Sequence, residues 1–314
     1  MVAAAHQRIH SSIVETPVED VSALFPAASA RVFFKMENLQ RTGSFKLRGA
    51  SNKILALSKK QAVAGVIAAS NGNHGLAVAA AARKAGIAAE IFVSELVSPG
   101  KAERIQRLGA TIRRFGVQPL EAEVAARAAA EKSGKVFISP YNDVDIMAGQ
   151  GTIAIELLQQ LGAVDAVFVA VGGGGLIGGM GTYLKSCSPQ TEVVGCWPQN
   201  SAVLYESIKA GKILDNVEER PTLSESTAGG LEAGSVTLDV CRNVIDRSVL
   251  VTENEILSAM RFLRDKKGWM IEGAAGVAVA AFIQNAERYR GKTIAVVICG
   301  GNLSEKVRAR LEEQ

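Results

Sequence analysis

The sequence predicts an α/β protein whose parallel sheets carry helices on both faces. Its 314 residues suggest about two domains, at roughly 150 residues per domain. Hydrophobic residues make up 48% and charged residues 21%, as in a chain that buries a sizeable core. Short β-rich apolar runs alternate with Ala-rich stretches of helical period. That alternation of strand and helix is typical of parallel sheets.

The first half of the chain contains four expected strands. The first is the apolar run at residues 62–69, and the polar turn 70–75 follows it. The elements expected after this turn are, in order, a helix at 76–84 closed by Gly86, a strand at 87–93, a helix at 100–108 stopped by Gly109, a strand at 112–115, an Ala-rich helix at 121–133 and a strand at 136–138.

The second half repeats the same rhythm. Its expected elements are a helix at 149–161, a strand at 166–171, a helix at 176–185, a strand at 192–196, a helix at 202–210, a strand at 294–299 and a terminal helix. Polar, turn-prone residues at 212–234 predict a long irregular connection, and such loops are often functional. Ligands bind doubly wound sheets at the carboxyl ends of the strands, where the turns 70–75, 172–175 and 299–302 fall.

Charge and composition exclude several classes of protein. The net charge is +4, from 35 basic and 31 acidic residues, aromatic residues are only 5%, and Lys and Arg do not cluster, so nucleic-acid binding is not expected. No apolar run is long enough to span a bilayer, and residues 1–12 lack the pattern of a signal peptide. The 4 cysteines have neither disulfide-framework nor zinc spacing. We therefore expect a cytoplasmic protein that binds no membrane.

Four consecutive glycines, 172–175, follow a strand and open a helix. Backbone N–H groups at such a place converge on an anion, which predicts a phosphate site; a tight packing turn is the alternative. Gly173, Gly175 and Gly178 also have the spacing of a dinucleotide-binding loop. That function needs an acidic residue at the end of the next strand, but Glu192 stands at its beginning. A nicotinamide dehydrogenase is therefore disfavoured and stays open.

Three further segments carry candidate chemistry. Lys46 is a surface charge in the ordinary case, but in a desolvated pocket its amine loses a proton more readily and bonds covalently to aldehydes. The turn 70–75 offers backbone N–H groups with the side chains of Asn73 and His74, or it is simply a buried hydrogen-bonded turn. Cys299, at a strand end, is either a small apolar residue or a thiol that faces a ligand ring.

Taken together, these segments resemble the pyridoxal-phosphate enzymes of fold type II. The motifs are SFKLRGA at 44–50, NGNHG at 71–75, AGQGT at 148–152, the four glycines, EGAAG at 272–276 and CGGN at 299–302. Within that family the chain is similar to the threonine/serine dehydratase and serine racemase branch. The resemblance implies two doubly wound parallel-sheet domains with pyridoxal 5'-phosphate in the cleft between them, and a homodimer. Residues 1–45 and 146–314 would form the large domain, and residues 46–145 the small one.

The resemblance also implies roles for individual residues. Lys46 would bond to the cofactor and take the α-proton of the substrate. The remaining cofactor contacts would come from Phe45 against the ring, Asn73 at the ring hydroxyl, Gly172, Gly173, Gly174 and Gly175 at the phosphate, Cys299 opposite the ring nitrogen, and Glu272 nearby. The expected substrate-binding residues are Ser70, Asn71, Gly72, His74 and Tyr141.

Departures from the racemase pattern narrow the expected activity. Asn71 stands where serine racemases carry a serine, and an amide is a poor proton donor or acceptor, so two-base racemisation is disfavoured. Tyr141 lies where dehydratases often have an aromatic ring. Trp197 and Val203 occupy the positions of the racemases' metal ligands and offer no oxygen, so no metal site is expected. Cys299, with no acid in its turn, favours elimination.

The predicted function is β-elimination from a 3-hydroxy α-amino acid, giving a 2-oxo acid and ammonia. As implied by the resemblance, the chain is a threonine/serine ammonia-lyase (dehydratase), and L-threonine or L-serine is the expected small-molecule substrate. The alternatives are a dehydratase of a bulkier amino acid, of the phenylserine or hydroxyectoine-catabolic type, and an amino-acid racemase. A dehydrogenase and a non-catalytic amino-acid sensor are the alternatives from other classes.

Overall fold

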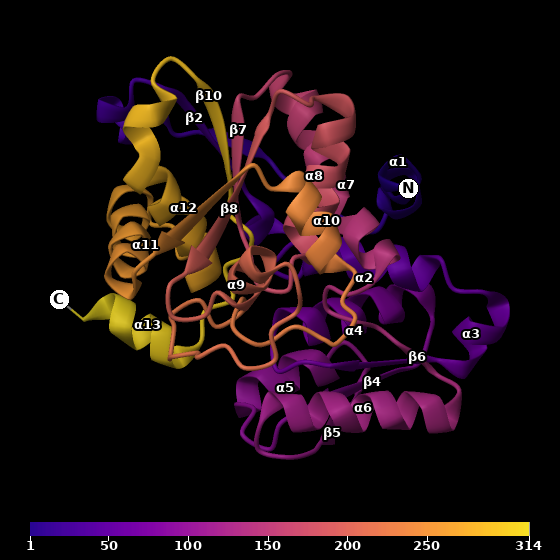
Figure 1. Cartoon of the computed structure of the whole chain (residues 1–314). Coiled ribbons are helices and arrows are strands. Elements are labelled where there is room, and N and C mark those ends of the chain that lie inside the picture. Colours follow the sequence, from indigo (N-terminus) through magenta and orange to yellow (C-terminus); the bar gives the residue numbers. More distant parts are fainter. Residues whose placement is uncertain (314) are drawn as a thin grey trace.

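Two separate sheets form the framework of the computed structural model, which describes residues 1–313. The larger sheet contains, in spatial order, β1 (Val18–Asp20), β2 (Arg31–Lys35), β10 (Thr293–Val297), β7 (Ala166–Ala170), β8 (Glu192–Pro198) and β9 (Arg247–Val251). The smaller sheet contains β5 (Thr111–Arg114), β4 (Ala89–Val93), β3 (Val66–Ala69) and β6 (Val136–Phe137). All strand pairs are parallel except β1 with β2, which is an antiparallel edge pair (Figure 1).

Helices cover both faces of the smaller sheet. They are α2 (Lys46–Leu55), α4 (Asn73–Ala85), α5 (Pro99–Gln106) and α6 (Pro119–Ser133). Alternate residues of each strand point to opposite faces. Ala68 and Ile91 accordingly pack with α2, α4 and α5, whereas Ile67 and Phe92 pack with the alanines of α6. Both faces are buried, which explains why these strands read as continuous apolar runs.

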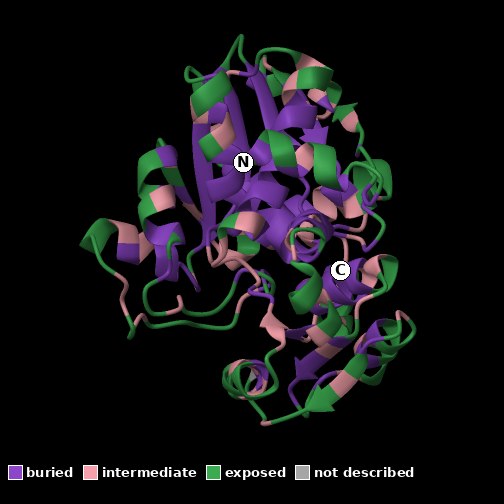
Figure 2. Ribbon diagram, turned by 90° about the vertical axis from the view of Figure 1, so that its right-hand side faces the viewer, coloured by how far each residue is buried: buried purple, intermediate pink, exposed green. Residues whose placement is uncertain are grey.

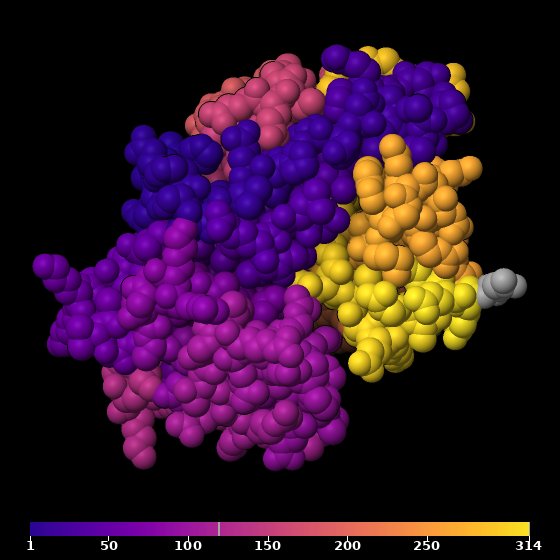
Figure 3. Space-filling view, turned by 180° about the vertical axis from the view of Figure 1, so that it is seen from behind, coloured from indigo at the N-terminus to yellow at the C-terminus, as the bar shows by residue number. Residues whose placement is uncertain are grey.

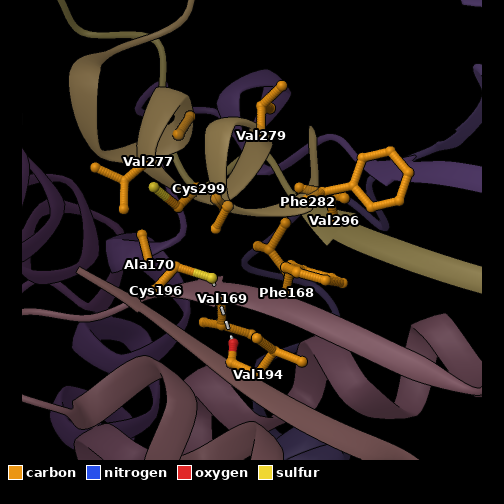
Figure 4. Packing of buried hydrophobic residues seen from close by; sticks show 14 of the residues in the cluster. Phe168, Val169, Ala170, Val194, Cys196, Val277, Val279, Phe282, Val296 and Cys299 are labelled. Atoms are coloured by element: carbon orange, nitrogen blue, oxygen red, sulfur yellow. Dashed lines mark hydrogen bonds between the residues drawn. The ribbon is translucent and has the colours of Figure 1, made fainter. Parts of the chain in front are cut away.

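The larger sheet has the same layered construction. In Figure 1, α7 (Val144–Leu161), α8 (Gly175–Cys187) and α10 (Thr237–Val244) lie on one side of it, and α11 (Glu253–Lys267) and α12 (Gly273–Asn285) lie on the other. Phe282 of α12 meets Phe168 of β7 edge to face, with ring centroids 5.6 Å apart, and Figure 4 shows this packing. Figure 2 shows the buried strands inside helices whose outer faces are exposed. The predicted two-sheet α/β fold is confirmed.

The remaining helices are short. They are α1 (Val2–Ile9), α3 (Lys59–Ala64), α9 (Val203–Ala210), α13 (Glu305–Glu312) and the 3-10 turns Ser22–Leu24, Pro26–Ala28, Glu37–Leu39 and Ala286–Tyr289. Ile9 and Ile13 pack in the core of the smaller sheet, and Arg104 of α5 donates to Asn302 near α13. Figure 3 shows the yellow C-terminal residues beside the magenta smaller-sheet half.

The expected strand at 62–69 is wrong in its first half. A capping box of Ser58 and Gln61 starts α3 there, and Gly65, at a φ of +93°, ends it, so the strand begins only at Val66. The apolar residue Val63 is 88% exposed on this helix. The composition of a short apolar run does not by itself distinguish a solvent-facing helical turn from a buried strand.

The irregular connection expected at 212–234 is present, and no helix or strand interrupts it. It leads from α9 to α10 and passes over the carboxyl ends of the large-sheet strands. Across residues 1–313, no helix combines the length and the apolar character needed to cross a membrane.

Candidate active site

Lys46 is the first residue of α2, and backbone contacts fix its position between the two sheets. The amide of Phe45 donates to the carbonyl of Cys299 at 3.0 Å, and Ser44 forms a bridge with Gly300. The Nζ atom of Lys46 donates to the carbonyl of Pro140 at 2.8 Å and lies 5.2 Å from the Phe45 ring centroid. The amine therefore lies next to two segments: the residues that follow the last strand of the smaller sheet, and the 299–302 turn.

Burial changes the acid–base behaviour of this amine. It lowers the pKa of Lys46 from 10.5 to about 8, although the nearby Glu272 and Cys299 oppose the shift. The surrounding protein atoms displace water from the amine, so the charged ammonium form loses part of its hydration. An appreciable fraction of Lys46 is then neutral near pH 7–8, the form needed for a nucleophile or a base.

A buried group of four charges lies under the first turn of α2. Arg48 donates to Glu37 Oε1 at 2.8 Å and to Glu156 Oε1 at 2.6 Å, and Lys35 donates to Glu156 Oε2 at 2.7 Å. All four side chains are at most 1% exposed, and their charges sum to zero. The group ties α2 to β2 and α7, and thereby fixes the helix that carries Lys46.

Asn73 opens α4 and joins three segments at the site. Its Nδ2 atom donates to Glu272 Oε2 at 2.8 Å, and its Oδ1 atom accepts from Asn302 Nδ2 at 2.7 Å. Asn302 in turn donates to the carbonyl of Thr42 at 2.9 Å. The turn after β3, the turn after β10 and the start of α12 are therefore held together through one amide.

The other residues of the 70–75 turn differ in their freedom to bind a ligand. Ser70 Oγ accepts from the amide of Gly72 at 3.1 Å. Both ends of the Asn71 amide are engaged with Ser94: Nδ2 donates to Ser94 Oγ at 2.8 Å, and Oδ1 accepts from Ser94 N at 2.9 Å. A Cβ placed on Gly72 would meet nothing within 4 Å, so space is open at that point of the turn.

His74 is buried and uncharged. Its Nε2–H donates to the carbonyl of Ile138 at 2.8 Å. Burial, together with the charge of Lys46, lowers the pKa of His74 from 6.5 to about 3. The imidazole is therefore neutral at pH 7 and contributes no positive charge to a substrate carboxylate.

The pKa of His74 predicts how stability depends on pH. In the unfolded chain His74 is protonated below about pH 6.5, whereas in the folded protein it stays neutral down to about pH 3. Protonation therefore favours the unfolded state, and stability falls as the pH falls through this window. Between about pH 7 and pH 5 the wild type should lose about 2 kcal/mol more unfolding free energy than His74→Gln, measured by urea denaturation of the apoprotein. Equal losses in the two proteins would contradict the assignment.

The glycine run forms a cradle that side chains would fill. A Cβ on Gly172 would lie 2.7 Å from the carbonyl oxygen of Thr227, and one on Gly173 would lie 2.4 Å from the ring of Tyr141. Gly174 has a φ of +86°, in the left-handed region, and caps the start of α8. The backbone N–H groups of a helix start are thereby opened to an anion.

Glu272 and Cys299 complete the centre of the site. The carboxylate of Glu272 accepts from Asn73 and from Ser226 Oγ, each at 2.8 Å, and burial raises its pKa. The Cys299 thiol lies 4.0 Å from Glu272 Oε1, and burial raises the pKa of Cys299 well above its usual value, so the thiol stays protonated. A Cβ on Gly300 would lie 2.6 Å from this carboxylate.

Tyr141 lies next to the cradle, one residue after the carbonyl that holds Lys46. Its hydroxyl accepts from the amide of Glu232 at 2.8 Å. Burial raises the pKa of the hydroxyl, so the phenol stays protonated. Residues 140–141 therefore connect the amine of Lys46 to the glycine cradle.

The structure brings the predicted cofactor-contact residues together, and pyridoxal phosphate fits them. The Gly172–Gly175 cradle suits the phosphate of this cofactor, and the desolvated amine of Lys46 suits its aldehyde. Phe45 is a suitable neighbour for its ring. Sequence reasoning gave no role to Pro140, Ser226 or Thr227, and it named Asn302 only as the end of the CGGN motif. The polar character of residues 212–234 was the only signal for two of them, because backbone carbonyls and loop hydroxyls have no motif.

The positions that racemases use for metal are apolar in this chain. Trp197 is 1% exposed, and its ring centroid lies 5.6 Å from that of Tyr205. Val203 is buried at the start of α9. No group of three or more His, Cys, Asp or Glu residues within 1–313 is placed to hold a metal ion.

The fold and the site together define an enzyme that binds pyridoxal phosphate between two parallel-sheet domains. The family model described as "Pyridoxal-phosphate dependent enzyme" matches residues 9–300, and the chain belongs to that family. The resemblance seen in the motifs is thereby confirmed.

Similar proteins come from both functional branches of the family. An L-threonine ammonia-lyase from Thermotoga maritima is 38% identical over 95% of this chain and 74% of its own length. A serine racemase from Arabidopsis thaliana is 35% identical over 95% of this chain and 91% of its own length. The solved structure of the processed threonine deaminase isoform 2 from Solanum lycopersicum superposes with a TM-score of 0.92, at 30% identity over 99% of this chain and 92% of that one.

Proposed function

We propose that the chain is a pyridoxal-phosphate-dependent ammonia-lyase that removes water from a 3-hydroxy α-amino acid, with L-threonine or L-serine as substrate. The observation that carries this proposal is the desolvated amine of Lys46, which is bonded to the carbonyl of Pro140, the residue before the Tyr141 that lies against the glycine cradle. The similarity to L-threonine ammonia-lyase and threonine deaminase supports the same reaction class.

Bound pyridoxal phosphate supplies an electron sink for the electrons left at the α-carbon. The residues of the chain orient the reactants and move protons. Lys46 would hold the cofactor covalently and would accept the α-proton at Nζ, and the backbone of Gly172–Gly175 would hold the phosphate. Asn73 would hold the ring hydroxyl, and Ser70, Asn71, Gly72 and His74 would line the place of the substrate carboxylate. Tyr141 closes the side nearest the cradle.

Cys299 supports elimination over a long-lived carbanion. A carboxylate opposite the ring nitrogen would keep that nitrogen protonated, and a protonated ring stabilises the carbanion. The Cys299 thiol is neutral instead, and the carboxylate of Glu272 beside it is engaged with Asn73 and Ser226. Loss of the β-hydroxyl then competes well with return of the proton.

A substrate panel tests the proposal. The purified holoenzyme should show a visible absorbance band that borohydride abolishes, and it should release equal amounts of 2-oxo acid and ammonia from L-threonine or L-serine. Turnover of phenylserine alone would assign the bulkier substrate class. A colourless protein that binds NAD would overturn the proposal in favour of the dehydrogenase.

Racemisation is the second candidate, because a serine racemase is among the similar proteins. It needs a proton donor and acceptor on the face opposite Lys46. The Asn71 amide is bound at both ends by Ser94 and is unsuited to this task. Measuring the chirality of the recovered substrate together with 2-oxo acid release separates the two activities.

Chelation should leave the activity intact. Trp197 and Val203 supply no oxygen ligand, so prolonged treatment with EDTA should change 2-oxo acid formation by less than about twofold. A matched sample with added magnesium serves as the control. Strong loss on chelation, with recovery on adding magnesium, would contradict the argument from these two positions.

We further propose that the enzyme acts in the cytoplasm and that it is a homodimer. Its large domain would consist of residues 1–45 and 146–314, and its small domain of residues 46–145. The four cysteines are free and irregularly spaced, which supports a reducing compartment. Light scattering of the purified protein tests the assembly.

A further inference from the structure

Residues 223–236, called the strap here, cross the active site from one domain to the other. At the beginning of the strap, the carbonyl of Leu223 approaches Gly273 so closely that a Cβ there would lie 1.9 Å from it. Ser226 then binds Glu272, and Thr227 lies against Gly172 of the cradle. The strap therefore touches both the carboxylate at the centre of the site and the phosphate cradle.

The carboxylate of Glu232 makes three of the contacts that fasten the far end of the strap. Glu232 Oε1 accepts from Ser139 Oγ at 3.1 Å, and Oε2 accepts from Asn142 Nδ2 at 2.9 Å. Arg127 of α6 pairs with the same Oε2 at 2.7 Å. These donors belong to α6 and the 139–142 segment, both of which follow strands of the smaller sheet.

The strap and Tyr141 hold each other in place. The amide of Glu232 donates to the Tyr141 hydroxyl at 2.8 Å, and the amide of Val236 donates to Asn142 Oδ1 at 3.0 Å. The Tyr141 ring lies against Gly173, so displacing Glu232 frees the ring that closes the cradle.

Arg127 is itself held firmly. It donates to Glu123 one turn earlier in α6 at 2.9 Å, and its guanidinium lies 4.2 Å from the centroid of the Phe137 ring. A guanidinium that stacks on an aromatic ring and pairs with two carboxylates has little freedom to reorient. Arg127 is thus a fixed anchor on the smaller-sheet domain.

We propose that Glu232 is a positioning residue of the active site: its carboxylate fastens the strap to the smaller-sheet domain and so holds Tyr141 over the phosphate cradle. Both carboxylate oxygens are engaged with donors from Ser139, Asn142 and Arg127, so Glu232 acts through Tyr141 and not on a substrate. The kinetic consequences rest on the proposed function, whereas the fastening of the strap does not.

The test compares Glu232→Gln with Glu225→Gln. Glu225 lies in the same strap, but its carboxylate accepts only an exposed bond from Ser304 Oγ at 2.9 Å. In Glu232→Gln, peptides covering the strap should exchange amide hydrogen about tenfold faster. The substitution removes the ion pair with Arg127 and disturbs the hydrogen bonds that the carboxylate accepts from Ser139 and Asn142. In Glu225→Gln the same peptides should exchange as in the wild type. This measurement needs no turnover.

The kinetic arm uses the holoenzyme and the hydroxy amino acid that it turns over. Glu232→Gln should raise KM by about tenfold while kcat changes by less than about threefold. Substrate binding depends on Tyr141 being held in place by the fastened strap, whereas proton removal by Lys46 does not. Arg127→Gln, at a side chain that is 38% exposed, is the second variant and should shift KM in the same direction. It keeps the proposal testable if Glu232→Gln does not fold.

Unchanged hydrogen exchange in the strap of both variants would overturn the proposal. A fall in kcat with constant KM would also overturn it, because Glu232 would then act in the chemical step. Faster exchange in a protein that turns over no hydroxy amino acid would support the fastening and contradict only the proposed function.

Discussion

Lys46→Ala is expected to abolish the formation of 2-oxo acid. The substitution removes both the covalent attachment of the cofactor and the base that takes the α-proton, and a positioned base alone contributes about 10²–10⁴-fold. We expect kcat to fall by at least about 10⁴-fold, because both functions are lost together. Ammonia and 2-oxo acid release measure this, and mass spectrometry after borohydride reduction measures the loss of covalently bound cofactor.

The matched control is Lys53→Ala, on the same helix. The Lys53 side chain is 19% exposed and pairs with Asp143 and Asp145 at the start of α7, so its ammonium is neutralised by carboxylates and does not bond to the carbonyl of Pro140. Its loss should leave kcat within about twofold, since partly exposed pairs contribute little. Persistent turnover in Lys46→Ala, or reduced cofactor attached to a different lysine, would refute the assignment of Lys46.

Arg48→Met should destabilise the fold more than most single substitutions do. Arg48 neutralises Glu37 and Glu156 in a region from which water is excluded, so its removal leaves a buried excess of negative charge. Breaking such a group by removing one partner costs about 3–5 kcal/mol. The difference in unfolding free energy between variant and wild type, from urea denaturation at neutral pH, measures this cost.

Arg107→Met is the control for the loss of an arginine. Arg107 pairs with Glu103 on the surface of α5, and the two side chains are 71% and 59% exposed. Its loss should cost less than about 1 kcal/mol, because water screens the pair. A similarly small effect for Arg48→Met would mean that the buried carboxylates take up protons or water easily and that the group does not hold α2.

The sequence predicts a secondary-structure element best when the element is fully buried and glycines mark its end. The strand at Ala166–Ala170 and the glycines after it were both expected, because the strand is buried on both faces and the glycines end it without ambiguity. The elements β2, β9 and α2 were not anticipated. Their residues carry charges that point to solvent or, as with Lys35 and Arg48, to buried partners that cannot be inferred from local pattern.

The chemistry of the site was also anticipated unevenly. Lys46, Asn73 and the glycine cradle stand in motifs whose residue types already suggest covalent, amide and phosphate contacts. In contrast, the full engagement of the Asn71 amide by Ser94 and the neutral state of His74 depend on tertiary burial. Neither follows from the residue type at its position.

By itself, the amino-acid sequence predicted the class of fold from its alternating strand and helix patterns, and its motifs, through their family resemblance, predicted a phosphate cradle at the four glycines and Lys46 as the reactive amine. Only the tertiary structure decided what surrounds that amine. The bond from Lys46 to Pro140 joins residues 94 positions apart, and the bond from Asn302 to Asn73 spans 229. Contacts at such separations arise only when the two sheets close around one space, and that closure sets the pKa of Lys46 and holds the strap over the cradle.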